Sequence, residues 1–439
     1  MSRGLRTFIF IFFVAVFVVV APSLVLYAQG YRLNLPLEPG KKLIVMTGGL
    51  FIKTNPKQAD VLINGSLSGQ TDFFFGSALV ENLLPRQYRV EVKKDGYQTW
   101  EKNLSINEKE VTEARNITLF PAEIGFSAAE KNVDSILLSP DGKKIALRGQ
   151  NNGIWNLRLY DIAQNVTVSL VDEHDFSAKT ASFVDWKWAD AKTLNVSAAT
   201  GNATSTWTIA TDKDPARIAK IAAANPVGAT TTIELAPQKN EGSSYYLGQD
   251  GFIYKKDALG NPAKISPAQV SLKPGVDYSL WVFNNYYFVK AGAELFVLSP
   301  GKNSFEKIFD KLSSDPKLSP DGKKVLIFSD SEIWIFFLKD KTDQPTATAG
   351  DKIFIARLSE KIADCDWLNS DYLIFTAGNT IKAAEIDNRD KANIYDLAKM
   401  SDISPNAKTG QPSQLIWSSD QKTIYLFLDN TLFESQPVE

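Results

Sequence analysis

The sequence contains few of the side chains that catalytic and metal sites require. Its only histidine, His174, lies in the run Asp172-Glu173-His174-Asp175, a composition that would suit a metal ion or acid–base chemistry. We interpret this run as a solvated acidic loop, because neighbours in one loop lack the spacing that brings ligands together around an ion. The only cysteine, Cys365, excludes an intramolecular disulfide and a multi-cysteine metal site. We expect Cys365 to be a buried, inert thiol.

A serine hydrolase would need a nucleophile, a base and an orienting acid, and His174 is the only histidine base available. Ser66 and Ser68 lie in a Gly- and Ser-containing stretch, but it does not form the Gly-x-Ser-x-Gly nucleophile elbow. A glycine-rich phosphate-binding motif is also missing. The sequence therefore predicts no catalytic, cofactor-binding or metal-ligating residue, and the protein is predicted not to be an enzyme.

Two other features resemble ligand sites but have simpler explanations. The turns Ser139-Pro140-Asp141-Gly142 and Ser319-Pro320-Asp321-Gly322 could be calcium loops or sialidase-type Asp-boxes. Proline, aspartate and glycine are the residues that tight turns need, so we interpret both as structural turns. Among the nine tryptophans, three occupy equivalent repeat positions and are predicted to pack in the core: Trp188, Trp367 and Trp417. Trp100 lies outside the repeats and is a candidate for an exposed aromatic side chain.

Composition and charge place the chain among ordinary globular proteins. Of its 439 residues, 44% are hydrophobic and 22% are charged, which excludes global disorder and a multi-span membrane protein. The net charge of the chain is −2. Residues 1–42 contain five basic residues and one acid, so residues 43–439 carry a net charge of about −6. This balance predicts no nucleic-acid partner.

A charge-free apolar run covers Thr7–Ala28 and is long enough to span a bilayer. We predict a tail over residues 1–6, a transmembrane signal-anchor helix over 7–28 and a linker over 29–47 that contains Pro36, Pro39 and Gly40. A cleaved signal peptide remains the alternative, although the run is longer than a usual signal core. Arginines and lysines flank both ends almost equally, so the predicted extracytoplasmic orientation rests on the short N-terminal tail.

Residues 48–121 show the alternation and turns of a compact β module. The strands predicted at Leu50–Thr54 and Val61–Ile63 are followed by Asn55-Pro56 and by the hairpin signal Asn64-Gly65. Tyr88–Val92 alternates with period two, and Asp95-Gly96 marks a further turn. The ordered residues that carry a family resemblance are Pro56-Lys57-Gln58-Ala59, Val61, Asn64-Gly65, Gly69, Leu84-Pro85, Tyr88, Val90, Val92 and Lys94-Asp95-Gly96-Tyr97.

This order resembles the PEGA domain, a small β-sandwich-like module of bacterial and archaeal surface proteins. Four positions depart from the family pattern, and one of them is Asp72, which stands where a proline often follows Thr71. Lys57 and Gln58 replace its Glu and Gly, and Arg86 replaces the glycine after Pro85. The resemblance implies a role in presentation or contact at a surface, without catalysis.

Residues 122–439 contain an internal repeat. Ser139-Pro140-Asp141-Gly142-Lys143-Lys144 recurs at residues 319–324. Weaker copies of the turn begin at 188, 236, 283, 368 and 418, giving a mean spacing near 46. That period is typical of a four-stranded propeller blade, and seven turns predict about seven blades, with six or eight as alternatives. The two full copies resemble TolB-like and WD-like propeller repeats of secreted and periplasmic proteins.

The fold class is therefore predicted to be all-β: an N-terminal transmembrane helix, a PEGA-like module and a closed propeller of about seven blades. We expect a membrane-anchored, extracytoplasmic binding or scaffold protein of a prokaryotic cell envelope. Its propeller would bind a protein, a peptide or an envelope polymer through loops on one face, without a cofactor. Two alternatives remain open: a lyase- or glycosidase-type enzyme with paired carboxylates in the central channel, and a purely structural envelope protein.

Overall fold

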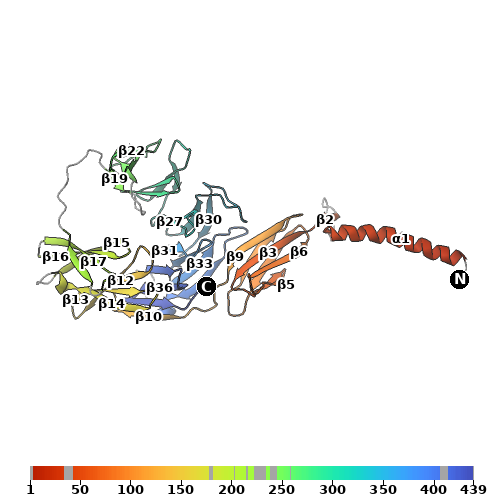
Figure 1. Cartoon of the computed structure of the whole chain (residues 1–439), viewed down its shortest axis with the longest axis horizontal. Helices are drawn as coiled ribbons and strands as arrows, with labels where there is room; N and C mark the ends of the chain where they lie inside the picture. The colour runs from red at the N-terminus through yellow and green to blue at the C-terminus, as the bar shows by residue number, and fades with distance from the viewer. Residues whose placement is uncertain are drawn as a thin grey trace.

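The computed structural model shows a helix, a small β module and a large group of four-stranded sheets along one long axis (Figure 1). It describes residues 3–33, 43–176, 181–201, 203–213, 216–221, 234–237, 245–257, 259–405 and 414–438. The predicted all-β fold with one apolar helix is confirmed. The linker residues Pro36, Pro39 and Gly40 lie outside the described residues.

Helix α1 (Arg3–Ala28) has no buried residue, and Pro22 lies inside it. Among the described residues it is the one helix long and apolar enough to cross a membrane. The helix begins at Arg3, four residues before Thr7, the predicted first residue of the span. Part of the expected linker forms a two-stranded sheet of β1 (Tyr31–Leu33) and β2 (Ile44–Met46).

Arg32 connects the end of α1 to the small module. Its Nη1 donates to the carbonyl oxygens of Tyr27 (2.7 Å) and Tyr31 (2.9 Å), and its guanidinium lies 3.5 Å from the centre of the Tyr27 ring. The last carbonyls of a helix lack partners within the helix, so Arg32 supplies one. Its Nη2 donates to Asn82 Oδ1 in the module at 2.7 Å.

Two sheets form the small module. One has the order β6 (Ser77–Leu83), β3 (Gly48–Asn55), β9 (Val111–Thr118). The other has the order β5 (Ser66–Gln70), β4 (Asp60–Ile63), β7 (Gln87–Lys93), β8 (Trp100–Ser105). Alternate side chains of β3, β4 and β7 are buried between the sheets. Asn64 and Gly65 both have positive φ, as the predicted hairpin requires.

The rest of the described chain contains seven further four-stranded sheets, which we number as blades. Blade 1 is β11 (Ser135–Leu138), β12 (Lys144–Asn151), β13 (Ile154–Asp161) and β14 (Val166–Asp172). Blade 2 is β15 (Ser182–Asp190), β16 (Thr193–Thr200), β17 (Ala203–Ala210) and β18 (Arg217–Lys220). Blade 3 is β19 (Glu234–Pro237), β20 (Tyr245–Gly248), β21 (Ile253–Lys256) and β22 (Pro262–Lys264). Blade 4 is β23 (Tyr278–Phe283), β24 (Tyr286–Ala291), β25 (Glu294–Leu298) and β26 (Glu306–Phe309).

Blade 5 is β27 (Lys317–Leu318), β28 (Lys324–Phe328), β29 (Glu332–Phe337) and β30 (Lys352–Arg357). Blade 6 is β31 (Ile362–Trp367), β32 (Tyr372–Ala377), β33 (Thr380–Glu385) and β34 (Ile394–Lys399). Blade 7 is β35 (Gln414–Ser418), β36 (Thr423–Leu428) and β37 (Thr431–Ser435), with β10 (Phe126–Lys131) as its outer strand. Two short helices lie between blades, η1 (Glu173–Asp175) and α2 (Met400–Ile403).

The predicted turns connect the first and second strands of the blades, as the repeat required. In the third copy, Gln238 lies outside the described residues. Because β10 precedes blade 1 in sequence but pairs with β37, the two ends of the propeller chain are joined in blade 7. The prediction of about seven blades is confirmed.

Clusters of buried side chains join six neighbouring pairs of blades: 2 with 1, 1 with 7, 7 with 6, 6 with 5, 5 with 4 and 4 with 3. Within the described residues no such cluster joins blades 2 and 3, and Figure 1 shows β19 and β22 apart from blade 2. The described part of the ring is therefore open there, unlike the closed ring that we expected.

The repeated tryptophans pack between blades. The Trp188 indole of blade 2 donates to the carbonyl of Leu137 in blade 1 at 3.2 Å. The Trp367 indole of blade 6 donates in the same way to Lys317 of blade 5 at 3.0 Å. Trp417 is half-buried against the cluster of blades 6 and 7. Their predicted core position is confirmed.

A buried tyrosine at the junction of blades 1 and 7 is expected to make stability pH-dependent. Tyr160 donates to Asn165 Oδ1 (2.7 Å) and approaches Glu434 at 3.3 Å. Burial raises the pKa of the Tyr160 phenol to about 12, although its hydrogen bond with Tyr425 acts to lower this pKa. Since folding favours the neutral phenol, this contribution to stability is complete below about pH 10, the pKa of an unperturbed tyrosine, and is lost as the pH rises through the folded pKa.

We therefore expect the free energy of unfolding to fall between these two pH values, and to fall less steeply in Tyr160→Phe. Urea unfolding of the full chain in detergent over an alkaline pH series measures the slope. Equal slopes in the two proteins would contradict this assignment.

Candidate functional site

The structure places the histidine run at the end of blade 1 and gives its acids a structural role. Asp172 caps η1 by accepting from the His174 backbone N–H at 2.8 Å, and the Asp172 N–H donates to Asp175 at 2.8 Å. The His174 side chain is exposed. In the part of the chain that the structure describes, no group of His, Cys, Asp and Glu side chains could hold a metal ion.

The other candidate groups are likewise separate. Ser66 and Ser68 lie on β5 in the small module, whereas His174 lies beyond β14 at the opposite end of the molecule (Figure 1). Cys365 is fully buried, and burial raises the pKa of its thiol. The predicted burial of this thiol is confirmed.

The two Ser-Pro-Asp-Gly copies use the same internal hydrogen bonds. Ser139 Oγ donates to Asp141 (2.7 Å) and accepts from the Lys144 N–H (2.9 Å). Ser319 makes the equivalent bonds at 2.6 and 2.9 Å. Their polar side chains are therefore engaged within the turn, in agreement with a structural role.

The expectation that Trp100 is exposed is wrong. Its side chain is 1% exposed, and its indole donates to Glu385 Oε2 of blade 6 at 2.8 Å. Trp100 lies at the end of the module that faces the propeller, so the docking of the two parts covers it. One cluster of buried side chains includes residues of the module, blade 6 and blade 7.

A buried ion pair lies beside Trp100. Lys102, which is fully buried, contacts Glu385 Oε1 at 2.7 Å. The Lys102 ammonium also donates to the carbonyls of Asp387 (2.7 Å), Arg389 (3.1 Å) and Lys391. Burial raises the pKa of Glu385, although Lys102 and Trp100 act in the opposite direction. We call this contact, centred on Trp100, Lys102 and Glu385, the seam.

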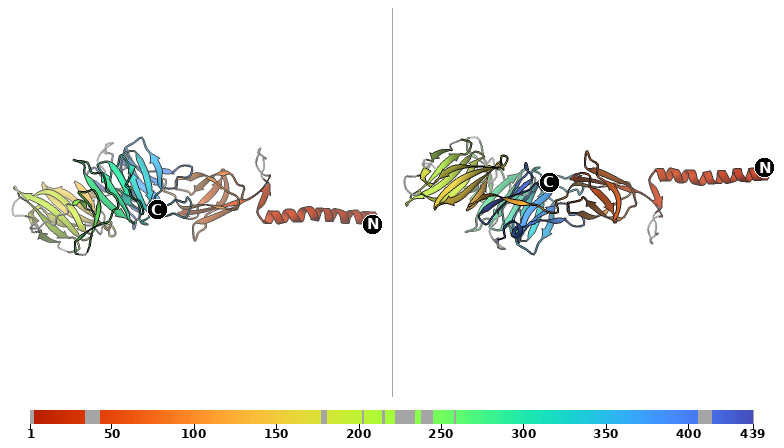
Figure 2. Two further views of the ribbon diagram at one scale, coloured as in Figure 1. Left: turned by 90° about the horizontal axis from the view of Figure 1, so that it is seen from above. Right: turned by 90° about the horizontal axis from the view of Figure 1, so that it is seen from below.

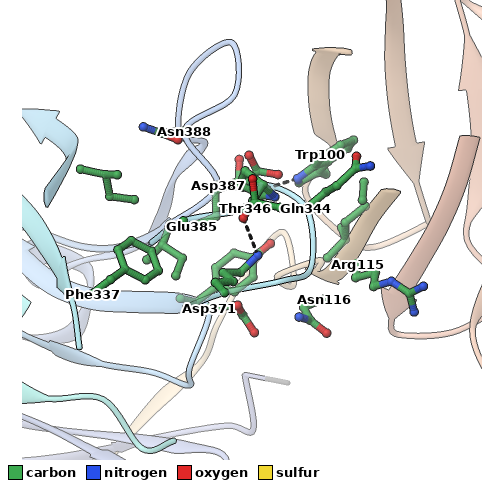
Figure 3. Close-up of a pocket in the computed structure, with 18 residues that line it drawn as sticks. Trp100, Arg115, Asn116, Phe337, Gln344, Thr346, Asp371, Glu385, Asp387 and Asn388 are labelled. Carbon is green, nitrogen blue, oxygen red and sulfur yellow. Dashed lines mark hydrogen bonds between the residues drawn. The ribbon is translucent and has the colours of Figure 1, made fainter. Parts of the chain in front are cut away.

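A narrow cavity adjoins the seam (Figure 3). It lies between Trp100 and Arg115 of the module, the loop that carries Gln344 and Thr346, and Asp371 and Glu385 of blade 6. Burial raises the pKa of the Asp371 carboxyl. The space open to small molecules is about 50 Å³, enough for a few waters but far less than a substrate pocket. The cavity therefore belongs to the contact between the two parts.

The seam fixes which face of the propeller points away from the module. The propeller residues around the seam and its cavity include Asp371, Asp387 and Gln344, which lie in connections between strands 1 and 2 or strands 3 and 4 of a blade. Connections between strands 2 and 3, and from one blade to the next, lie at the opposite ends of the strands. We call that opposite side the distal face. Figures 1 and 2 show the helix, module and propeller in sequence along the molecule.

The distal face has an excess of negative charge. Its described connections carry three lysines, Lys273, Lys311 and Lys361, and eleven acids: Asp134, Glu173, Asp175, Asp250, Asp277, Asp310, Asp315, Asp330, Glu360, Asp402 and Asp429. The described connections on the module side are nearly balanced. They carry ten basic residues: Lys143, Lys192, Lys213, Lys302, Lys323, Lys339, Lys341, Arg389, Lys391 and Lys422. They carry eleven acids: Asp141, Asp212, Asp257, Asp321, Asp340, Asp343, Asp351, Asp371, Asp387, Asp390 and Asp420. Composition alone does not reveal this asymmetry.

A carboxylate pair lies on the innermost strand of blade 6. Asp364 and Asp366 contact Lys317 Nζ of blade 5 at 3.3 and 2.9 Å. Asp364 also accepts from the Leu415 N–H of blade 7 at 3.4 Å. Burial acts to lower the pKa of Lys317, but Asp366 and Asp364 together raise it. This channel cluster, Lys317, Asp364 and Asp366, therefore holds its carboxylates in an ion-paired network.

The sequence comparison supports the module directly. Residues 47–122 match the PEGA domain family. From here we call the module the PEGA domain. The comparison with curated proteins found no match.

Solved structures that resemble the chain are propeller proteins. YCF48 from Cyanidioschyzon merolae is 11% identical, with a TM-score of 0.39, and the match covers 71% of this chain and 98% of that one. An oligogalacturonate lyase in complex with manganese is 10% identical, with a TM-score of 0.38 and coverage of 72% and 96%. We draw no functional conclusion from likenesses this distant.

Proposed function

We propose that this chain is a membrane-anchored, extracytoplasmic binding protein without catalytic activity, whose distal face binds a basic segment of a protein or peptide. The observation that carries the proposal is the docking of the PEGA domain on the module side. It leaves the acidic distal face as the side presented away from α1. We place the short N-terminal tail in the cytoplasm.

Charge and rigidity both favour such a role. An excess of one sign over a face attracts partners of the opposite sign and raises association rates. The buried seam holds the propeller against the PEGA domain, so the distal face keeps its orientation relative to that domain. The ion pairing of Asp364 and Asp366 with Lys317 supports a non-enzymatic channel, since an acid–base pair needs one carboxyl free to donate a proton.

We expect a fluorescent decalysine peptide to bind the full chain in zwitterionic nanodiscs, and a decaglutamate peptide not to bind. The distal variant Asp277→Asn/Glu360→Gln/Asp402→Asn should weaken decalysine binding about tenfold, because it removes three charges from the face. Fluorescence anisotropy at low and physiological salt measures the affinity.

The matched control removes three acids from the module side: Asp212→Asn/Asp343→Asn/Asp420→Asn. It changes the net charge equally, and we expect its affinity to stay within about twofold of the unmodified chain. Equal weakening in both variants would mean general charge attraction and would contradict the proposal. So would an absence of decalysine binding at low salt.

A further inference from the structure

Three consecutive phenylalanines lie exposed on a loop of the PEGA domain. Phe73, Phe74 and Phe75 connect β5 to β6 and are 65%, 75% and 75% exposed. Phe73 and Phe74 pack edge to face at 5.5 Å. We call these three side chains the Phe tip. Such contiguous apolar exposure is uncommon on a soluble surface and typically marks a contact site.

The loop holds the Phe tip in one conformation. Asp72 accepts hydrogen bonds from the N–H groups of Phe74 (2.8 Å), Phe75 (2.6 Å) and Ser77 (2.8 Å), and from Ser77 Oγ (2.7 Å). These bonds hold the pKa of Asp72 well below its usual range. Gly76 has positive φ, and a Cβ there would lie 2.5 Å from the Thr54 carbonyl oxygen. The aromatic side chains are therefore displayed by a preorganised loop, which lowers the entropic cost of a contact.

Charged groups beside the Phe tip are turned onto the loop itself. The Lys57 ammonium donates to the Phe74 carbonyl at 2.6 Å, and Lys94 donates to the Lys57 carbonyl. The Asp72 carboxylate is occupied by the four donors named above. The outward surface is consequently apolar, which favours an apolar partner over an anionic lipid surface.

The position of the Phe tip relative to the anchor narrows the choice of partner. Strand β6 ends near Asn82, which binds Arg32 at the end of α1, and begins at Ser77 beside the Phe tip. The six steps from the first to the last of its seven residues separate the two ends by about 20 Å. The Phe tip is therefore displaced from the end of the anchor by a strand length. With α1 as the anchor, every copy in one membrane carries the Phe tip on the same side of the bilayer.

We propose that the Phe tip binds the Phe tip of a second copy of this chain in the same membrane. A two-fold contact needs the same patch on both partners, and a two-fold axis along the membrane normal keeps both anchors in one bilayer. This proposal rests on the anchoring role of α1 but not on peptide binding by the distal face.

The size of the patch predicts a weak contact that the membrane strengthens. Three phenylalanines exposed to this degree offer roughly 300–500 Å² on each copy. A stable soluble dimer commonly buries about 800 Å² on each partner. Confinement in one bilayer raises the effective concentration of the partner, so we expect a dimer in membranes and mostly monomer in dilute detergent.

Disulfide cross-linking in proteoliposomes tests this proposal. The only native cysteine, Cys365, is buried, so the unmodified chain gives the background. We expect Phe74→Cys to form a cross-linked dimer on oxidation, at least tenfold above the matched control Leu259→Cys, which is 87% exposed on blade 3. Non-reducing gel electrophoresis measures the dimer fraction.

Two additional variants separate a specific contact from random collision. Phe73→Ser/Phe74→Cys/Phe75→Ser keeps the cysteine but removes its apolar neighbours. Asp72→Asn/Phe74→Cys keeps those neighbours but weakens the loop. Both should cross-link several-fold less than Phe74→Cys. Cross-linking of Phe74→Cys at the Leu259→Cys level, or undiminished cross-linking in these variants, would overturn the proposal.

Flotation of the proteoliposomes reports anchoring separately, so failure to insert is distinguished from failure to dimerise. Decalysine binding plays no part in this assay. Its outcome is therefore independent of the proposed function of the distal face.

Discussion

Replacing Lys102 by methionine is expected to lower the free energy of unfolding by about 3–5 kcal/mol, because it leaves Glu385 buried without its counter-ion. The same change removes the donor to three backbone carbonyls of the loop after β33. Trp100 and the Asn393 N–H would remain as partners of Glu385, but neither carries a charge. We expect the PEGA domain and blade 6 to separate before the rest of the propeller unfolds.

Differential scanning calorimetry of the full chain in detergent measures this loss, and limited proteolysis near residues 122–125 reports separation at the seam. The matched control is Arg89→Met, which removes the exposed ion pair with Glu101 on the neighbouring strands β7 and β8. The buried Glu91, which Arg89 also contacts at 3.5 Å, keeps its ion pair with Lys93. Exposed pairs contribute little, so the control should barely shift the transition.

The double variant Lys102→Met/Glu385→Leu removes both charges together. It should recover much of the loss, because the main cost of the single change is the uncompensated carboxylate. An unfolding transition unchanged in Lys102→Met would show that the two parts do not depend on the seam. A double variant no better than the single one would show that the carbonyl contacts, and not the charge balance, dominate.

The parts of the fold that depend on local chemistry were predictable from the sequence. The turn residues of the two Ser-Pro-Asp-Gly copies form their hydrogen bonds within a few positions, so their spacing alone predicts the blades. Asn64 and Gly65 predict a hairpin for the same reason. The equivalence of Trp188 and Trp367 follows from repetition, because equivalent positions in successive blades meet equivalent neighbours.

The seam was not predictable, because it joins residues far apart in the chain. Trp100 and Glu385 are separated by 285 positions, and no repeat relates them. A tryptophan outside the repeat therefore had no expected neighbour. Lys102 lies on an alternating strand of the module, where a lysine usually faces solvent, and only docking explains its burial.

The charge asymmetry of the propeller also required the topology. Acids such as Asp277, Asp330 and Asp429 are scattered along the chain, and a net charge of −2 conceals their grouping. They meet on one side because they occupy connections at the same ends of the strands. The Phe tip had a visible signal in the run Phe73-Phe74-Phe75, but a short continuous apolar run is also typical of a buried strand.

The channel cluster offers the second large effect, and it bears on whether the propeller is an enzyme. Lys317→Met is expected to lower the free energy of unfolding by about 2–3 kcal/mol at neutral pH, less than a fully buried pair because Asp366 is partly exposed. Its removal leaves two like charges on one strand and loses a link between blades 5 and 6. The exposed pair of Lys361 and Asp330 supplies the control, and Lys361→Met should change little.

One further variant separates the loss of an ion pair from simple loss of packing. Lys317→Met/Asp364→Asn/Asp366→Asn should regain most of the stability, since no uncompensated charge remains. If the loss is instead independent of the asparagine changes, Lys317 acts through packing. Asp364 and Asp366 would then not need its charge, and a catalytic carboxylate pair in the channel would regain support.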